Sequence, residues 1–244
     1  MRLKAKRIVI TGGSQGLGRA LATRFAEEGA RIAICSRTYD ELNRVALDLA
    51  VRGHAPVFAS CDIADADQVK RFSDLVLSEF GSVDVLVNNA SVLGQRIEIV
   101  DWTRSAWDRV IDVNVNGLFA VTKAFLPSMI GQRAGSIVNV SSSVGRKGRA
   151  GWGAYAVSKF ALEGFTQTLA DEVRHHGIRV NSVNPGALDT EMRHAAYPDE
   201  NRDTLKKPLE VTDVFVFLAS DESRGTTGQC FDAQDYFKTK KEIV

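Results

Sequence analysis

The chain has 244 residues, a length that fits one α/β domain or two small ones. Its 31 basic and 30 acidic side chains nearly cancel, so the net charge gives no reason to expect a nucleic-acid partner. No apolar segment is long enough to span a bilayer, and no stretch has the composition of a linker or a repeat. We therefore expect a single domain over residues 1–244, with no membrane association.

Cysteine and histidine usage argues against a disulfide framework or a metal site. The three cysteines, Cys35, Cys61 and Cys230, are odd in number and widely spaced, which is typical of reduced thiols in a cytoplasmic protein. The four histidines have no metal-ligand spacing, so we expect no structural metal. The charged amino terminus resembles the start of a signal peptide, but the apolar run after it, residues 8–10, is too short for one.

The first expected element is a strand that leads directly into a glycine-rich turn. Residues 7–10 form a short apolar run, and the turn at 11–18 precedes an apolar pattern of helical period that ends at Gly29. Glycines let a backbone turn tightly and approach a pyrophosphate, whose charge the free N–H groups of the helix N-terminus would meet. This opening predicts a dinucleotide-binding site; a glycine-rich turn without a ligand is the alternative.

The end of the second strand, residues 31–35, indicates which dinucleotide binds. Cofactor folds of this kind often place an acidic residue here, where it accepts hydrogen bonds from the adenosine ribose. This chain has Ser36, Arg37 and Thr38 instead, and a guanidinium group matches a 2′-phosphate. We therefore predict a preference for NADP(H), with a solvated arginine of no function as the alternative.

Polar residues also follow the next two expected strands and interrupt a long helix. Asp62 would accept a hydrogen bond from the adenine amino group, or cap the next helix. Asn88 and Asn89 would brace the sheet and line the cofactor cleft, or form a simple turn. Asn114 lies amid the apolar pattern of the helix. Because a buried amide must be hydrogen-bonded, Asn114 either satisfies a local carbonyl or holds an ordered water.

The helix that contains Tyr155 carries a chemical pair. Tyr155 and Lys159 are four residues apart, so both side chains would lie on one face of the helix. An ammonium group near a phenol stabilises the phenolate, so we expect the pKa of Tyr155 to fall from about 10 toward neutrality. Ser142 follows the fifth strand and would lie at the carboxyl end of the sheet, where ligands bind in open α/β folds. Taken alone, the spacing is weak evidence, because such pairs occur by chance on solvated helices.

Strands and helices alternate along the whole chain. Such alternation predicts an α/β fold, a single-domain Rossmann-type doubly wound parallel sheet of about seven strands with helices on both faces. The expected elements after the second strand are helix 42–49, strand 56–60, helix 67–80, strand 83–87, one long helix 104–130, strand 136–140, helix 155–175, strand 179–183, helix 211–219 and strand 229–232. The segment 191–209 is polar and irregular.

In order and spacing, these residues resemble the short-chain dehydrogenase/reductase family, and the match extends from Thr11 to Asp232. The matching motifs are T-G-x-x-x-G-x-G (Thr11, Gly12, Gly16, Gly18), N-N-A (Asn88, Asn89, Ala90), the family's catalytic Asn (Asn114) and Ser (Ser142), Y-x-x-x-K (Tyr155, Lys159) and P-G-x-x-x-T (Pro185, Gly186, Thr190). Each motif is modest, but their agreement in order is specific. The resemblance implies an NADP(H)-dependent enzyme similar to the 3-oxoacyl-carrier-protein reductases.

The resemblance also implies roles for individual residues. Ser142 would hold the substrate carbonyl oxygen, and Tyr155 would protonate it as hydride arrives from the nicotinamide. Lys159 would lower the pKa of Tyr155 and hold the nicotinamide ribose, and Asn114 would fix a water that links Lys159 to solvent. The residues implied to contact NADP(H) are Gly12, Ser14, Gln15, Gly16, Leu17, Ser36, Arg37, Thr38, Asp62, Ile63, Asn89, Ala90, Ser91, Tyr155, Lys159, Pro185, Gly186, Leu188 and Thr190.

The implied substrate pocket has a mainly apolar wall beside the reactive carbonyl. Its candidate residues adjoin the motif positions and are Ser142, Ser143, Val144, Trp152, Leu93, Ala187 and Met192. The basic residues Arg146, Lys147 and Arg149 would attract an acidic substrate or an acyl chain on an acidic carrier protein, or form a solvated loop. In this family, the region that corresponds to 191–209 closes over the substrate.

Two positions depart from the family pattern. Ser91 stands where the family usually has glycine after N-N-A, which would narrow that turn. Asp232, Ala233 and Gln234 stand where the family often has D-G-G, which leaves the usual C-terminal packing between subunits open. We still expect a homo-oligomer, a dimer or a tetramer, that associates through the two long helices.

Three functions fit this sequence. The favoured one is an NADPH-dependent carbonyl reductase that acts on a small-molecule substrate, such as a 3-oxoacyl thioester or another ketone. An NAD-linked alcohol dehydrogenase working in the oxidative direction is the second, and Arg37 speaks against it. A non-catalytic cofactor-binding or regulatory protein on the same fold is the third. The intact set of four catalytic residues argues against that reading.

Overall fold

The computed structural model describes residues 1–236, and the end of the predicted domain, residues 237–244, lies outside the described residues. Seven strands form one parallel sheet in the order β3-β2-β1-β4-β5-β6-β7. The strands are β1 (Arg7–Thr11), β2 (Arg31–Ser36), β3 (Val57–Ser60), β4 (Val85–Asn88), β5 (Gly135–Val140), β6 (Ile178–Asn184) and β7 (Cys230–Asp232). The predicted doubly wound parallel sheet is therefore confirmed, and each predicted strand lies within about two residues of the observed one.

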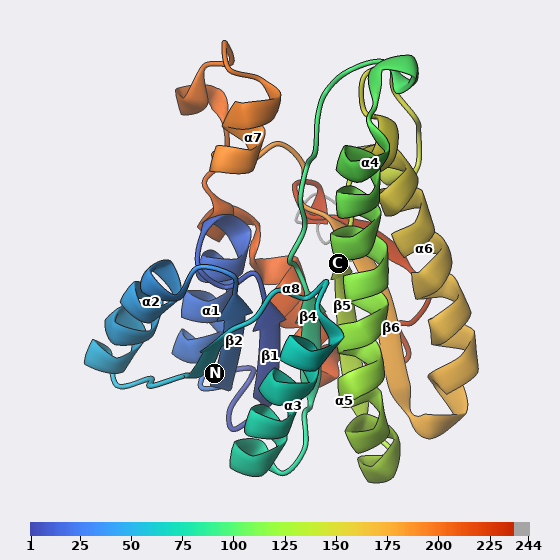
Figure 1. The fold of residues 1–244 in the computed structure, drawn as a ribbon. Coiled ribbons are helices and arrows are strands. Elements are labelled where there is room, and N and C mark those ends of the chain that lie inside the picture. Colours follow the sequence, from blue (N-terminus) through green and yellow to red (C-terminus); the bar gives the residue numbers. More distant parts are fainter. Residues whose placement is uncertain (237–244) are drawn as a thin grey trace.

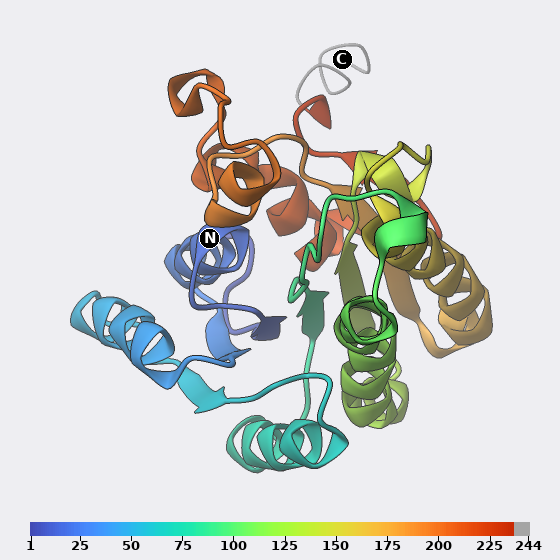
Figure 2. The same cartoon turned by 45° about the horizontal axis from the view of Figure 1, so that its top comes forward.

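Helices cover both faces of the sheet (Figures 1 and 2). One face packs against α1 (Gly16–Glu27), α2 (Tyr39–Val51) and α8 (Asp213–Ala219). The other packs against α3 (Ala66–Phe80), α5 (Leu118–Gln132) and α6 (Gly153–Val173). None of the helices within residues 1–236 combines the length and apolarity needed to cross a membrane.

The central strand β1 shows why its run of apolar residues forms a buried strand. Ile8 and Ile10 belong to the core beneath α1, whereas Val9 belongs to the core on the opposite face. A parallel sheet covered on both faces needs apolar side chains in both directions, which this run supplies. Strand order reverses between β1 and β4, so their carboxyl ends border a crevice where ligands bind in such folds.

The long helix expected over 104–130 differs from an uninterrupted α-helix. It consists of α4 (Arg104–Ile111), a π-helical segment (Asp112–Gly117) and α5, which follow one another along one path (Figure 1). The wider turn coincides with the buried Asn114 and with Gly117, where a β-carbon would lie 2.8 Å from a side-chain carbon of Ile63. Periodicity alone did not reveal this segment, because a single wider turn hardly changes the apolar pattern.

The polar segment after β6 is more ordered than the sequence suggested. It contains α7 (Glu191–Ala196) and short 3₁₀ turns at 202–204 and 208–211. Ion pairs hold it together: Asp189 accepts from Arg202 at 2.6 Å and from Lys207 at 2.7 Å. These pairs join residues up to 18 positions apart, so a local pattern does not reveal them.

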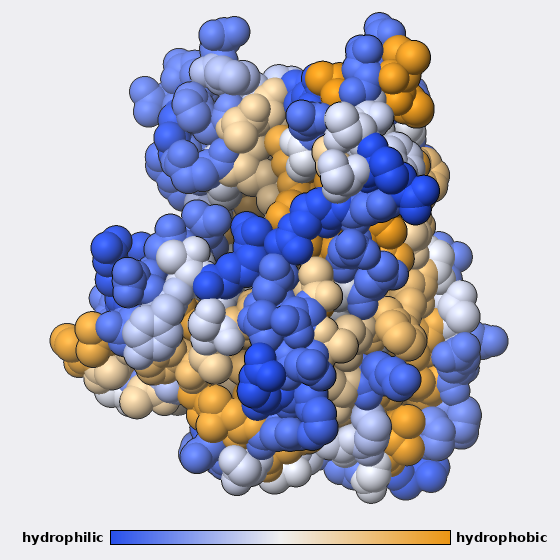
Figure 3. All heavy atoms as spheres, in the orientation of Figure 1, coloured by the Kyte–Doolittle hydropathy of each residue, from blue (hydrophilic) through white to orange (hydrophobic). Residues whose placement is uncertain are grey.

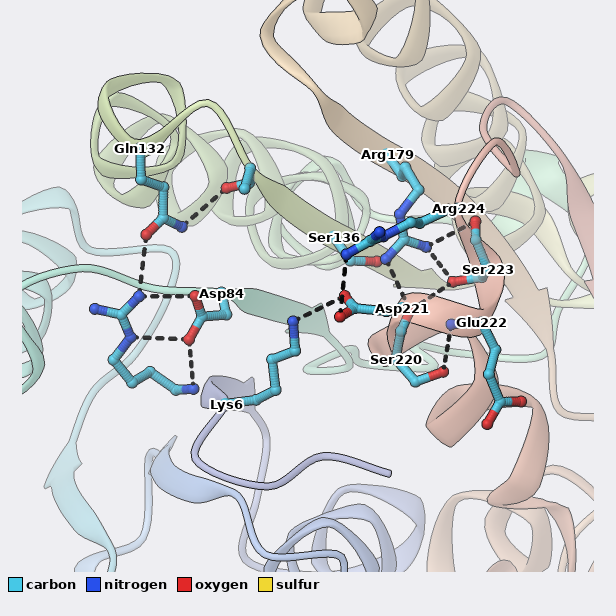
Figure 4. A network of polar contacts seen from close by, with 12 residues as sticks. Lys6, Asp84, Gln132, Ser136, Arg179, Ser220, Asp221, Glu222, Ser223 and Arg224 are labelled. Atoms are coloured by element: carbon cyan, nitrogen blue, oxygen red, sulfur yellow. Dashed lines mark hydrogen bonds and ion pairs between the residues drawn. The ribbon is translucent and has the colours of Figure 1, made fainter. Parts of the chain in front are cut away.

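The amino ends of the strands carry a polar network (Figure 4). Arg7, the first residue of β1, pairs with Asp84 at 2.7 Å, and Lys6 pairs with Asp221 at 3.0 Å. Arg179 on β6 donates to the carbonyl oxygens of Leu218 at 3.0 Å and Ser220 at 3.1 Å, where α8 ends. This network ties the sheet to its flanking turns at the edge opposite the strands' carboxyl ends.

Candidate active site

A cavity of about 420 Å³ lies at the carboxyl ends of the strands. Its wall is built from the segments that follow β1, β2, β3, β4, β5 and β6, together with the start of α6 and the segment around α7. Figure 3 shows the hollow between the part of the molecule that contains α7 and the upper ends of α4 and α6. The cavity therefore occupies the position where open α/β sheets bind ligands.

The glycine-rich turn forms one end of the cavity. Gly12 and Gly16 have φ angles of +69° and +52°, which favour glycine. A β-carbon on Gly18 would collide with the carbonyl oxygen of Gly12, so the turn packs directly against α1. The N-cap residue of α1, Gln15, makes no side-chain cap bond, and the first turn has no acidic residue. The N–H groups at this helix end are thus left for an anionic ligand, and a pyrophosphate fits them.

Next to this turn lies the pocket expected for an adenosine 2′-phosphate. Ser14, Ser36, Arg37 and Thr38 all line the cavity. The guanidinium of Arg37 forms no ion pair with any of residues 1–236, and its side chain is exposed. One lining residue that sequence reasoning missed is Glu41, whose carboxylate accepts from the Ser14 hydroxyl at 3.3 Å.

The polar residues after β3 and β4 have protein partners. Asp62 accepts from the Arg109 guanidinium at 2.8 Å and from the Ala64 N–H at 3.1 Å, and it also lines the cavity. It does not cap the next helix, because the N-cap of α3 is Asp65. Asn89 donates to the carbonyl oxygens of Thr11 at 2.9 Å and Gly12 at 3.1 Å. Asn89 therefore braces the end of β4 against β1, and it faces the cavity as well.

The reactive pair lies at the other end of the cavity, where α6 begins. Tyr155 is buried, and it lines the cavity together with Ser142 and Ser91. Lys159 donates from Nζ to the carbonyl oxygen of Val140 at 2.8 Å, and its Nζ lies 5.5 Å from the centre of the Tyr155 ring. The structure thus brings Ser142, Tyr155 and Lys159 together, as the sequence predicted.

The predicted pKa shift of Tyr155 is wrong in direction for this structure. Burial raises the pKa of Tyr155 to about 12, although the nearby hydroxyls of Ser142 and Ser91 oppose that rise. Burial lowers the pKa of Lys159 to about 8, and the charge of Glu163 opposes that fall. The sequence argument failed because the ammonium donates to a main-chain carbonyl rather than to the phenol, and because burial disfavours the phenolate.

Asn114 lies behind the cavity wall rather than in it. Its Oδ1 accepts from the Ser91 hydroxyl at 3.0 Å and from the Val92 N–H at 2.8 Å. Its Nδ2 donates to the Val92 carbonyl at 2.9 Å and to the Ser158 hydroxyl at 3.0 Å. These four bonds use the full capacity of a carboxamide, so the side chain has no place for the water predicted to bind it.

Glu163 is a buried acid that sequence reasoning missed. It follows Lys159 by one helical turn, and its carboxylate accepts from the hydroxyls of Ser141 and Ser182, the latter at 2.7 Å. The Cys230 thiol also donates to it, at 3.3 Å. The four-residue spacing from Lys159 was the signal that could have identified this acid, because it puts both side chains on one face of α6.

The substrate side of the cavity is apolar and aromatic. Leu93, Trp152, Met192 and Ala196 line it, and the rings of Trp152 and Tyr155 are 5.7 Å apart. Of the predicted pocket residues, Val144 is packed behind this wall, Ser143 is exposed outside it, and Ala187 uses its carbonyl to accept from Gln234 at 2.8 Å. Two arginines on the rim were not anticipated, Arg193 and Arg202, and both form ion pairs.

Part of the predicted basic cluster is occupied within the protein. Arg146 forms a two-pronged ion pair with Asp232, both contacts at 2.9 Å, and Asn184 donates to the same carboxylate at 2.6 Å. Lys147 and Arg149 are exposed. The residues that replace the family's D-G-G, Asp232–Gln234, thus link β7 to the loops around the site. Gln234 contributes by donating to a carbonyl in the loop after β6.

All the residues implied to contact a cofactor line the one cavity, from Gly12 to Thr190. Within residues 1–236, no group of three or more histidine, cysteine, aspartate or glutamate side chains is arranged to hold a metal ion. The donor set of the cavity, with a glycine turn, hydroxyls, one free guanidinium and a buried phenol beside an ammonium, fits a phosphorylated dinucleotide.

Comparison with known proteins gives consistent results. The family model described as short chain dehydrogenase matches residues 6–201. The 3-oxoacyl-[acyl-carrier-protein] reductase FabG of Thermotoga maritima is 41% identical over 241 residues, which are 94% of this chain and 96% of that protein. The uncharacterized oxidoreductase YciK of Escherichia coli is 38% identical over 230 residues, 93% of this chain and 91% of YciK.

Solved structures are similar over nearly the whole chain. A short chain dehydrogenase from Escherichia coli CFT073, complexed with NADPH, has a TM-score of 0.92 and 38% identity, with 96% of this chain and 98% of that chain covered. A second, from Shigella flexneri 2a and complexed with NADP, has a TM-score of 0.91 and 37% identity, with the same coverage of each chain.

Proposed function

Because the chain belongs to the short-chain dehydrogenase family, we propose that it is an oxidoreductase that uses NADPH to reduce a ketone to a secondary alcohol. One observation carries the proposal: Ser142, Tyr155 and Lys159 meet at one end of a cavity whose other end is the glycine turn and Arg37. A dinucleotide that spans these ends would bring its nicotinamide beside the phenol.

The preference for NADP(H) over NAD(H) is argued from the residues at the carboxyl end of β2. Arg37 forms no close ion pair within the described chain, although its charge helps to lower the pKa of Asp62, and it stands beside Ser36 and Thr38, a set that suits a 2′-phosphate. The similar solved structures complexed with NADPH and NADP support the same choice. When bound, the cofactor supplies the hydride.

The protein's own residues handle the proton. Ser142 donates to the carbonyl oxygen of the substrate, and Tyr155, whose pKa of about 12 keeps it protonated at neutral pH, transfers its proton to that oxygen. The phenolate that results is stabilised by the ammonium of Lys159, 5.5 Å from the ring centre. With a pKa near 8, Lys159 is also able to return a proton to the phenolate.

The substrate is proposed to be a ketone with an apolar portion. Leu93, Trp152, Met192 and Ala196 provide the wall against which that portion would pack. Among ketones, 3-oxoacyl thioesters are the first class to examine, because a relative with 41% identity is named as a 3-oxoacyl-[acyl-carrier-protein] reductase. Arg146 is not a free cation for an acidic carrier, since Asp232 pairs with it.

One observation favours a second candidate, an NAD-linked alcohol dehydrogenase. The carboxylate of Glu41 lines the cavity near Ser14 and would repel a 2′-phosphate. Comparison of Arg37→Ala with Glu41→Gln separates the two candidates. A selective loss of NADPH affinity in the first variant supports NADPH, whereas a gain of NADPH affinity in the second variant shows that Glu41 limits it.

The decisive experiment is a titration with NADPH and NADH, followed by the change in nicotinamide absorbance when ketones and 3-oxoacyl thioesters are added. We expect NADPH to bind more tightly and one carbonyl class to oxidise it, with at least a 10²-fold lower kcat in Tyr155→Phe. Tighter binding of NADH would reject the NADPH assignment. Cofactor binding without turnover across the panel would favour a non-catalytic protein.

We also propose self-association through α5 and α6. Phe119, Val157 and Phe160 on these helices are 53%, 46% and 46% exposed, which is a large apolar exposure for helices that otherwise pack into the core. We further propose a reducing compartment such as the cytoplasm, because the few, widely spaced cysteines Cys35, Cys61 and Cys230 are free thiols.

A further inference from the structure

Arg96 lies at the substrate end of the cavity, and the proposed reaction does not use it. It belongs to the segment between β4 and α4 and is exposed. Its Cζ lies 4.8 Å from the ring centre of Trp152 and 4.5 Å from that of Tyr197. Its guanidinium also donates to the carbonyl oxygen of Ala196. Because Trp152 and Ala196 line the cavity, Arg96 stands at the cavity's rim.

The other two arginines of this rim are neutralised within the protein, whereas Arg96 is not. Arg193 pairs with Glu200 at 2.6 Å, and Arg202 pairs with Asp189 at 2.6 Å. Arg96 forms no ion pair with any of residues 1–236, and its hydrogen bond there goes to a main-chain carbonyl, which has no net charge. A guanidinium has five N–H groups, so most of those on Arg96 are left for a ligand.

Aromatic stacking prepares this guanidinium to bind an anion. A guanidinium stacks its flat faces on aromatic rings, while its N–H groups lie in the plane and form a fork that matches a carboxylate or a phosphate. Trp152 and Tyr197 therefore hold the group without occupying the fork. Tyr197 is itself held, because Cζ of Arg193 lies 3.9 Å from its ring centre. Little side-chain freedom is then left to be lost when an anion binds.

The position of Arg96 relative to the phenol limits the size of the substrate. The Trp152 ring contacts the guanidinium, and its centre lies 5.7 Å from that of the Tyr155 ring. One aromatic ring thus connects the fork to the acid of the proposed reaction. A ketone held at Tyr155 would lay its chain along Trp152 and reach Arg96 after a few bonds. This geometry suits a small molecule with a short apolar chain between the ketone and an anionic group.

We propose that Arg96 is a specificity-determining residue that binds an anionic group of the substrate, a carboxylate or a phosphate a few bonds from the ketone. The ketone oxygen lies at Ser142 and Tyr155, the chain packs against Trp152, and the anionic oxygens accept from the Arg96 fork. This inference rests on the proposed function, because it names the class of ketone that the same site reduces.

The test compares wild type, Arg96→Gln and Arg96→Lys on matched ketones that differ in charge. One pair is 5-oxohexanoate and 5-oxohexanamide, and the other is the phosphate ester of 5-hydroxy-2-pentanone and the free alcohol. We expect wild type to prefer the charged member of at least one pair by about tenfold or more in kcat/KM. Arg96→Gln should lose this preference, and Arg96→Lys, which keeps the charge without the fork, should retain a smaller one. The pair with the larger preference identifies the anionic group.

The neutral ketones are the internal control for a merely structural role. Arg96→Gln should reduce them with a kcat/KM within about twofold of wild type, and its Kd for NADPH should be equally close, because Arg96 lies away from the glycine turn. Loss of kcat/KM on charged and neutral ketones alike would overturn the proposal, since Arg96 would then only hold the rings in place. A wild-type protein without any preference for charge would overturn it as well.

A matched control variant is Arg104→Ala, which removes an exposed arginine at the start of α4. It changes the net charge by the same amount as Arg96→Gln and should leave the preference unchanged. If it lowers the preference as much as Arg96→Gln does, the general field of the protein attracts the anion, and the assignment to Arg96 is wrong.

A second readout does not depend on turnover. Calorimetric titration in the presence of NADPH measures the binding of hexanoate and hexanamide, which have no ketone. We expect hexanoate to bind wild type about tenfold more tightly than Arg96→Gln, and hexanamide to bind both proteins equally. If no ketone is reduced but this difference is present, the anion site stands and only the proposed function is rejected. Equal binding of hexanoate to both proteins rejects the anion site.

Discussion

Lys159 is a buried cation whose proton affinity depends on one acid. Burial lowers its pKa to about 8, and the charge of Glu163, one turn later on α6, raises it. Glu163 is itself held by Ser182 at 2.7 Å and by the hydroxyl of Ser141. Because the proposed mechanism needs the ammonium form, Glu163 widens the pH range over which that form exists.

As the pH is raised, Glu163→Gln should therefore lose activity at a lower pH than wild type does. Glutamine can still accept from the two serines, but it has no charge to oppose the effect of burial on Lys159. The pH at which kcat falls on the alkaline side should decrease by about one unit. Glu172→Gln, an exposed acid on the same helix, is the control. An unchanged alkaline limb in Glu163→Gln would mean that Glu163 does not act on Lys159.

The same lysine should make stability depend on pH. Its pKa is about 8 in the folded protein, against an ordinary value of 10.5, so between these values the unfolded chain binds more protons. The free energy of unfolding contributed by Lys159 must then rise with pH across this window, by at most about 1.4 kcal/mol per pH unit. Below pH 8 both states are protonated, and the cost of burying the charge is constant.

Denaturant titrations of wild type and Lys159→Met across this range isolate the effect. The free energy of unfolding of wild type should increase relative to that of Lys159→Met as pH rises from 8 to 10. A constant difference would show that the ammonium is not desolvated in the folded protein. The comparison with Lys159→Met removes the contributions of other groups that titrate in the same range.

At the scale of elements, the two edges of the sheet have separate tasks. The carboxyl edge carries the candidate site, whereas the amino edge carries the network around Arg179 (Figure 4). Arg179 donates to the carbonyls of Leu218 at 3.0 Å and Ser220 at 3.1 Å. These are the last carbonyls of α8 and of the turn that follows, which have no partner within the helix.

Arg179→Ala should reduce the free energy of unfolding by about 2–4 kcal/mol, because it removes several charge-assisted hydrogen bonds that join β6 to the end of α8. The kcat should change little, since the site lies at the opposite edge. Chemical denaturation and steady-state kinetics measure the two effects separately. Arg174→Ala, an exposed arginine in the turn before β6, serves as the control and should change neither. Loss of kcat without loss of stability would contradict this division of tasks.

At the scale of the whole molecule, α5 and α6 combine two roles. Their inner faces pack on the sheet, and α6 supplies Tyr155 and Lys159, while Phe119 and Phe160 remain exposed. Association through these outer faces would bury apolar surface and hold the helix that carries the reactive pair.

Phe119→Glu combined with Phe160→Glu should convert an oligomer to a monomer, because two charges cannot be buried without partners at an apolar interface. Light scattering coupled to size-exclusion chromatography measures the mass directly. Leu47→Glu, an equally exposed apolar residue on α2, is the control and should leave the mass unchanged. A wild-type protein that is already monomeric would reject self-association through this face.

The sequence by itself determined the fold and most of the cavity. Apolar runs such as residues 8–10 form strands because both faces of a parallel sheet are buried, and Gly12, Gly16 and Gly18 shape the turn through local backbone geometry and close contact. The cofactor residues assigned from motifs all line one cavity, since motif residues follow strand ends that meet at the same edge.

Only the tertiary structure decided the partners of the polar groups. Asn114 bonds Val92 rather than a group of its own helix, Lys159 bonds the carbonyl of Val140, and Asp232 pairs with Arg146. Each of these contacts joins segments that are distant in sequence, so no local spacing encodes it. Burial, which raises the pKa of Tyr155 instead of lowering it, likewise depends on everything packed around the phenol, and it exists only once the chain has folded.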